Sequence, residues 1–181
     1  MALNLQKGQR EALSAQKFMV GLGWDVSSQS PAVDLDASVF MLNAAGKIPS
    51  DDYVIYFGQH ASPNQSVVHS GDNLTGDGDG DDEQIVIDLN KLEAGIEQIV
   101  VVVNIYEALD RRQNFGQVRN AFIRIVDTSG AELMKYELDE DFSVETGLEF
   151  GRLYLRGGAW KFEAMGIGSK ADLGGFMGKY S

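Results

Sequence analysis

The chain has no cysteine and only two histidines among its 181 residues. Disulfides, thiolate metal sites and cysteine nucleophiles are therefore excluded, and a zinc site has too few of its usual ligands. Basic residues are also scarce, because 15 Lys and Arg face 27 Asp and Glu, for a formal charge of −12. A surface of this charge repels the phosphates of nucleic acid and of anionic membranes. We expect neither of them as a partner.

Long apolar segments are missing as well. Ile99–Val103 is an apolar run of five residues, far short of the roughly 18 that a membrane-spanning helix needs. The first residues, Met1–Ser14, include Lys7, Arg10 and Glu11, so they lack the apolar region of a signal peptide. We therefore expect a cytoplasmic protein without stable membrane insertion.

Short apolar runs rich in Val, Ile, Phe and Tyr alternate with clusters of Gly, Asp, Asn and Ser, a pattern typical of strands. Ile99–Val103 has no polar position, which predicts a central strand that is buried on both faces. Gly157 and Gly158 can adopt positive φ and predict a hairpin over Leu148–Met165. The pattern predicts strands near Phe18–Trp24, Ser38–Leu42, Tyr53–Phe57, Ser66–His69, Gln84–Leu89, Gln98–Ile105, Ala121–Val126, Glu132–Glu137, Leu148–Leu155 and Trp160–Met165.

Helical patterns are short and few. They cover Glu107–Gln113, Asp139–Thr146 and Lys170–Tyr180, and none is long enough to build a helical layer. Hydrophobic residues make up 44% of the chain, which suffices for a core, and no Pro- or Gly-rich linker divides it. The sequence therefore predicts one domain over residues 1–181, an all-β sandwich of two antiparallel sheets with a few short helices.

One acidic segment, Gly71–Glu83, carries half of the net charge. Runs of acids are usually solvated loops, but here Asp77, Asp79 and Asp81 alternate with glycines and the segment leads directly into a predicted strand. Such spacing lets carboxylates and carbonyls turn toward one hard cation. Oxygen ligands without Cys or His favour calcium, magnesium or manganese, and a high ligand count favours calcium. The segment's acids are Asp72, Asp77, Asp79, Asp81, Asp82 and Glu83, and three further acids, Asp25, Asp34 and Asp36, occupy comparable turn positions.

Five motifs in this order resemble the TerD-type tellurium-resistance and stress-response family, from about Leu3 to Tyr180. They are Gly21–Asp25, Asp34–Ser38, Gly71–Gly76, Gly80–Glu83 and Asn114–Phe122. The resemblance implies a calcium-binding β-sandwich without established enzymatic activity, and we expect it to hold two Ca²⁺ ions. The metal ligands that it implies are Asp25, Asp34, Asp36, Asp72, Asp81, Asp82 and Glu83, with Asp77 and Asp79 in the same loop and Asn73 and Glu107 as further candidates.

Three functions remain open at this point. The first is a non-catalytic calcium-binding stress-response protein, with calcium and other stress-response proteins as partners. The second is a metal-dependent hydrolase in which a free carboxylate acts as the base. The third is a calcium-dependent carbohydrate binder. Because the sequence has no Gly-x-Ser-x-Gly, Walker A or His-Glu-x-x-His motif, we expect no enzyme and assign no catalytic residue.

Overall fold

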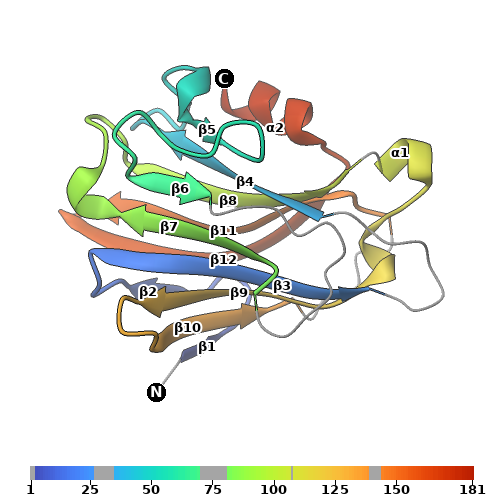
Figure 1. The fold of residues 1–181 in the computed structure, drawn as a ribbon, viewed down its shortest axis with the longest axis horizontal. Coiled ribbons are helices and arrows are strands. Elements are labelled where there is room, and N and C mark those ends of the chain that lie inside the picture. The colour runs from blue at the N-terminus through green and yellow to red at the C-terminus, as the bar shows by residue number, and fades with distance from the viewer. Residues whose placement is uncertain (1–2, 27–34, 70–80, 107, 139–143) are drawn as a thin grey trace.

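The computed structural model describes residues 3–26, 35–69, 81–106, 108–138 and 144–181. Two six-stranded sheets pack face to face, as Figure 1 shows. The first sheet has the order β1 (Leu3–Leu5), β10 (Glu132–Glu137), β9 (Val118–Asp127), β3 (Lys17–Val26), β7 (Glu83–Asp88) and β6 (Val67–His69). The second has the order β2 (Arg10–Ala12), β12 (Ala159–Ser169), β11 (Gly147–Arg156), β8 (Gln98–Ile105), β4 (Leu35–Leu42) and β5 (Val54–Ile55). The predicted all-β sandwich is confirmed.

The main core lies between the two sheets. On β7, Ile85 and Ile87 are fully buried in this core, while Gln84 and Val86 point to the other, exposed face. This alternation is typical of a sheet with one face in water. The central strand β8 differs, because Ile99–Val103 is buried throughout, as its sequence predicts.

The second face of β8 is covered by helix α2 (Leu173–Tyr180). Phe176 and Tyr180 of this helix pack on Phe40 of β4, with ring centroids 6.3 and 5.3 Å apart. Gly147 permits the close approach of the chain that leads into the helix, because a Cβ atom there would lie 2.3 Å from the carbonyl oxygen of Ala171. The second sheet is therefore buried on both faces where α2 covers it.

The other short elements differ in detail from the prediction. The expected strand Tyr53–Phe57 shortens to β5 after a turn of 3-10 helix, η1 (Asp51–Tyr53), and the predicted helices at Glu107–Gln113 and Lys170–Tyr180 shorten to α1 (Ala108–Arg111) and α2. Two further 3-10 turns are η2 (Leu89–Lys91) and η3 (Phe115–Gln117). Of the predicted helix Asp139–Thr146, residues 139–143 lie outside the described residues and residues 144–146 are not helical.

Two edge strands, β1 and β2, were not predicted. Each has three residues, too few for an alternating pattern to be recognised. Strand β1 runs parallel to β10, so the expectation of wholly antiparallel sheets is wrong at this one pairing. The predicted hairpin between β11 and β12 is confirmed, with φ values of 62° at Gly157 and 77° at Gly158.

None of the helices in the described part of the chain has the length and apolar character needed to cross a membrane.

Candidate functional site

The strands that carry the described candidate acids meet at one end of the sandwich. Figure 1 shows the end of β3, the starts of β4 and β7 and the end of β8 on the same side of the molecule. The strand registers agree, because Leu22 of β3 pairs with Glu83 of β7 and Leu35 of β4 pairs with Ile105 of β8. Within this end, each described acid has a different environment.

Asp81, just before β7, is held by an arginine on β9, which lies on the other side of β3 in the sheet. Its two carboxylate oxygens accept hydrogen bonds from Nε and Nη2 of Arg124 at 2.8 and 2.7 Å. The Asp81 side chain is fully buried, while that of Arg124 is 29% exposed and also faces Glu132 at 3.4 Å. The hydrogen bond to Asp81 is the largest cause that raises the pKa of Arg124 above its usual value. Such a paired and bidentate geometry is typical of a structural ion pair.

Gly21 of β3 makes room for this pair. A Cβ atom at position 21 would lie 2.5 Å from the carboxylate of Asp81, which is closer than two nonbonded atoms can approach. The first glycine of the Gly21–Asp25 motif therefore has a steric role in seating the end of the acidic segment against β3.

Asp82 is tied to β3 by two hydrogen bonds. Its carboxylate oxygen Oδ2 accepts one from the backbone N–H of Trp24 at 2.8 Å. Its own backbone N–H donates to the carbonyl oxygen of Leu22 at 2.7 Å. The main chain at residue 82 is thus fixed next to Trp24 and, through it, next to Asp25.

Glu83 links the two sheets. From β7 in the first sheet, its Oε2 accepts a hydrogen bond at 2.7 Å from the backbone N–H of Ala37 on β4 in the second sheet. The same oxygen lies 3.4 Å from Nε2 of His69, and both side chains are only 1% exposed. We call the three residues Asp81, Asp82 and Glu83 the anchor, because their side chains attach the end of the acidic segment to β9, β3 and β4.

Asp25 and Asp36 are the sequence neighbours of Trp24 and Ala37, the two residues whose backbone N–H groups the anchor binds. The two acids differ in exposure. Asp25 is exposed and accepts a hydrogen bond at 2.8 Å from Nδ2 of Asn120, whose φ of 54° places it in the left-handed region. Asp36 is only 5% exposed. It pairs with Asn104 across β4 and β8 and lines a cavity on the outer face of the second sheet.

The remaining candidates lie outside the described residues. These are Asp34, Asp72, Asn73, Asp77, Asp79 and Glu107. Across the part of the chain that the structure does describe, no group of three or more His, Asp or Glu side chains is placed to hold a metal ion. Calcium ligation by the candidate residues therefore stays a prediction.

Sequence reasoning missed the partners of the anchor. Arg124 gave a weak signal, since it is a charged residue between Ile123 and Ile125 in an otherwise apolar stretch of β9. The backbone N–H of Ala37 gave none. Asn120, the partner of Asp25, lies in the Asn114–Phe122 motif but was not assigned a role. Their roles depend on strand register and on the contact between the sheets, which no local pattern encodes.

Comparison with known proteins agrees with this architecture. The model of the TerD domain matches residues 1–180. The chain is 47% identical to General stress protein 16U of Bacillus subtilis (strain 168), over 96% of this chain and 94% of that protein. It is 44% identical to the Tellurium resistance protein TerD of Alcaligenes sp, over 99% of this chain and 97% of that protein.

The fold is also similar to a solved structure, the unknown function protein SAV2460. The TM-score is 0.72 and the identity 27%, over 90% of this chain and 94% of that one. The TerD domain model matches almost the whole length of the chain, and the identities to the two relatives agree with it. The chain belongs to the TerD family of tellurium-resistance and stress-response proteins.

Proposed function

We propose that this TerD-family chain is a non-catalytic calcium-binding protein of a stress or tellurium-resistance response, holding two Ca²⁺ ions at the end of the sandwich where the anchor lies. The names of its relatives support the response class. The chemistry of the candidate ligands supports calcium as the metal, because they offer carboxylate and amide oxygens, which suit calcium and not zinc or copper.

One observation carries the proposal. The anchor attaches the end of the acidic segment to the backbone N–H groups of Trp24 and Ala37, which are the sequence neighbours of Asp25 and Asp36. The end of the acidic segment is thereby attached to the strands that carry Asp25 and Asp36, across 58 and 46 positions of sequence, which a solvated acidic loop has no reason to require.

We further divide the candidate residues by their proposed roles. The side chains of Asp81 and Glu83 are only 0% and 1% exposed and accept hydrogen bonds from Arg124 and Ala37, so we assign them to positioning the segment. Asp25, Asp36 and Asp82 are assigned as ligands, together with Asp34, Asp72, Asn73, Asp77, Asp79 and Glu107. When bound, calcium supplies the positive charge that offsets the mutual repulsion of these acids.

Melting curves in EDTA, magnesium and calcium test the metal. Calcium accepts many flexible oxygen ligands, whereas magnesium retains its waters in a strict octahedron, so we expect calcium to raise Tm far more. At a free concentration of 100 times Kd, the stabilisation is about 2.7 kcal/mol. Equal shifts with both metals, or no shift, would contradict calcium binding.

The variant Asp25→Asn tests the ligand role apart from stability. Its side chain still accepts a hydrogen bond from Asn120, so Tm in EDTA should stay close to that of the unmodified chain. The rise in Tm on adding calcium should be smaller than for the unmodified chain. Asp52→Asn, which removes an exposed acid in η1, is the matched control. If both variants behave alike in calcium, Asp25 is not a ligand.

A further inference from the structure

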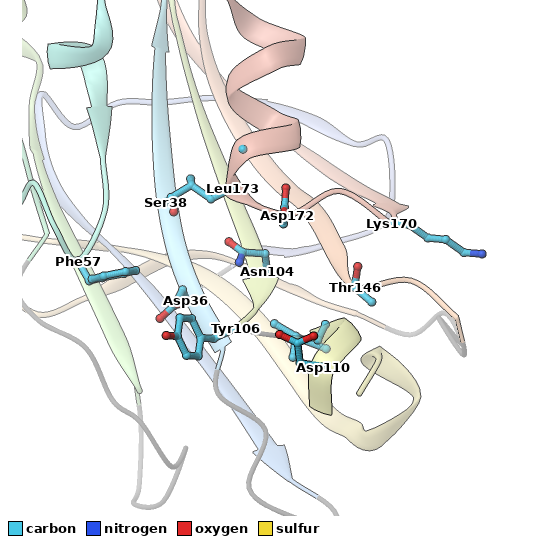
Figure 2. A pocket seen from close by; sticks show the side chains of 13 residues that line it. Asp36, Ser38, Phe57, Asn104, Tyr106, Asp110, Thr146, Lys170, Asp172 and Leu173 are labelled. Carbon is cyan, nitrogen blue, oxygen red and sulfur yellow. The ribbon is translucent and has the colours of Figure 1, made fainter. Parts of the chain in front are cut away.

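A cavity of about 420 Å³ lies on the outer face of the second sheet, beside the start of α2. Strands β4 and β8, helix α1 and the chain leading into α2 provide its walls, as Figure 2 shows. Its volume lies in the range of small-molecule sites, which is roughly 300 to 1,000 Å³.

The cavity begins where the outer face of the sheet changes from apolar to polar. Under α2, this face carries Phe40 and Leu42 of β4 and Val100 and Val102 of β8. Beyond them, toward the end of the sandwich that holds the anchor, the same face carries Ser38, Asp36 and Asn104. The helix covers the apolar part, and the polar part lines the cavity.

Two side chains of this wall are buried without a partner in the part of the chain that the structure describes. Ser38 is 1% exposed and Asn104 is 6% exposed. The hydroxyl Oγ of Ser38 and the amide oxygen Oδ1 of Asn104 have no hydrogen-bond partner among the described residues. Buried polar atoms are nearly always satisfied, so an exception at a cavity wall indicates a ligand or ordered water that completes the bonding.

The charges of the wall select a cation. Asp36, Asp110 and Asp172 line the cavity, and Lys170 is the one basic residue among the lining residues. In Figure 2 the Lys170 side chain extends away from the other labelled residues. The wall is thus rich in hydrogen-bond acceptors and carries a net negative charge. Such a wall attracts a positively charged hydrogen-bond donor and repels anions.

Two exposed aromatic rings flank these polar groups. Phe57 is 47% exposed and Tyr106 is 39% exposed, and both line the cavity. Large exposed rings next to a pocket offer an apolar surface, and their π-faces attract cations. The guanidinium of Arg111 already lies 5.3 Å from the centroid of the Tyr106 ring, so we assign the contact with a ligand's cation to Phe57 and an apolar contact to Tyr106. A ligand with both an ammonium group and an apolar part would use both features.

We propose that this cavity binds a small organic cation, an ammonium group joined to an apolar or aromatic body. The ammonium donates to the carboxylates, to Oδ1 of Asn104 and to Oγ of Ser38, while the apolar body lies against the aromatic rings. The site does not include the anchor, and among the described residues it shares only Asp36 with the proposed calcium ligands. Measurements in EDTA therefore test it independently of the calcium proposal.

Three probes of one shape and different charge test the proposal on the ¹⁵N-labelled full chain in EDTA: phenethylamine, 2-phenylethanol and phenylacetate. We expect phenethylamine to cause saturable shifts of the backbone amide signals of Ser38, Asn104 and Gly174. The alcohol should bind about tenfold more weakly and phenylacetate not at all. Equal binding of amine and alcohol, or no saturation by about 10 mM amine, would overturn the proposal.

Variants separate this site from a generally acidic surface. Asn104→Leu removes the buried unpartnered oxygen, so it should weaken phenethylamine binding about tenfold or more without lowering Tm. Asp110→Asn removes an exposed wall carboxylate and should weaken binding several-fold, whereas the remote Asp52→Asn should have no effect. Equal weakening by Asp110→Asn and Asp52→Asn would overturn the proposal. Should Asn104→Leu fold poorly, Ser38→Ala replaces it, with the same expected loss of binding.

Discussion

The anchor and the cavity wall are two buried polar regions at the same end of the sandwich, and both involve β4. In the anchor, both carboxylate oxygens of Asp81, Oδ2 of Asp82 and Oε2 of Glu83 accept hydrogen bonds from protein donors. In the wall, Oγ of Ser38 and Oδ1 of Asn104 have no hydrogen-bond partner among the described residues. Burial without a partner is costly. The comparison therefore contrasts side chains that attach one segment of the chain to its neighbours with wall side chains whose oxygens can accept a hydrogen bond from a ligand.

The largest expected effect concerns the anchor. Arg124→Gln leaves the fully buried carboxylate of Asp81 without its bidentate partner. Breaking a buried pair costs about 3–5 kcal/mol, and because Arg124 is partly exposed we expect a loss of about 2–3 kcal/mol in the free energy of unfolding.

Urea denaturation in EDTA measures this loss. Arg10→Gln is the control, since Arg10 pairs with Glu163 at 3.1 Å but is 50% exposed. Exposed pairs contribute about 0–1 kcal/mol. If the two variants lose the same stability, the anchor is no more than a surface ion pair.

A smaller effect is expected when the space for the anchor is filled. Gly21→Ala places a methyl group 2.5 Å from the Asp81 carboxylate, which Arg124 prevents from moving freely. Overpacking of this kind lowers stability by about 1–3 kcal/mol. Gly178→Ala in α2 is the control, because no atom lies within 4 Å of its new Cβ and alanine favours a helix by about 1 kcal/mol. A stable Gly21→Ala variant would show that Asp81 has room to move.

The smallest effect compares two serines of equal burial. Ser66 and Ser38 are both 1% exposed, but Ser66 donates a hydrogen bond to Glu93 at 2.6 Å and Ser38 has no partner. Ser66→Ala should lower stability by about 1–2 kcal/mol, while Ser38→Ala should be neutral or stabilising by a few tenths of a kcal/mol. Chemical denaturation of both variants measures the difference. Equal losses would mean that Ser38 has a structural partner after all.

How much the sequence predicted depends on how local each feature is. The run of β-branched residues in β8 and the glycine pair of the β11–β12 hairpin are local, so both predictions hold. The three-residue strands β1 and β2 carry no pattern of their own. They exist because neighbouring strands offer an open edge for pairing, which only the folded sheet reveals.

The candidate site follows the same rule. Composition and spacing were enough to mark the acidic residues, but they could not divide them by role. That Asp81 pairs with Arg124, 43 positions away, follows from the position of Asp81 against Gly21 of β3, which pairs with Arg124 of β9. That Glu83 reaches Ala37 follows from the packing of the two sheets. The cavity wall was invisible for the same reason, because Ser38 and Asn104 come together only through the pairing of β4 with β8.

Counting bound calcium tests the central claim most directly. The full chain, stripped with EDTA and dialysed against buffered calcium or against an equal concentration of magnesium, is analysed for metal content per chain. We expect two Ca²⁺ ions per chain and little bound Mg²⁺, since flexible oxygen ligands favour the larger ion. A chain that retains no calcium, or that retains as much magnesium as calcium, would contradict a calcium site at the anchor end of the sandwich.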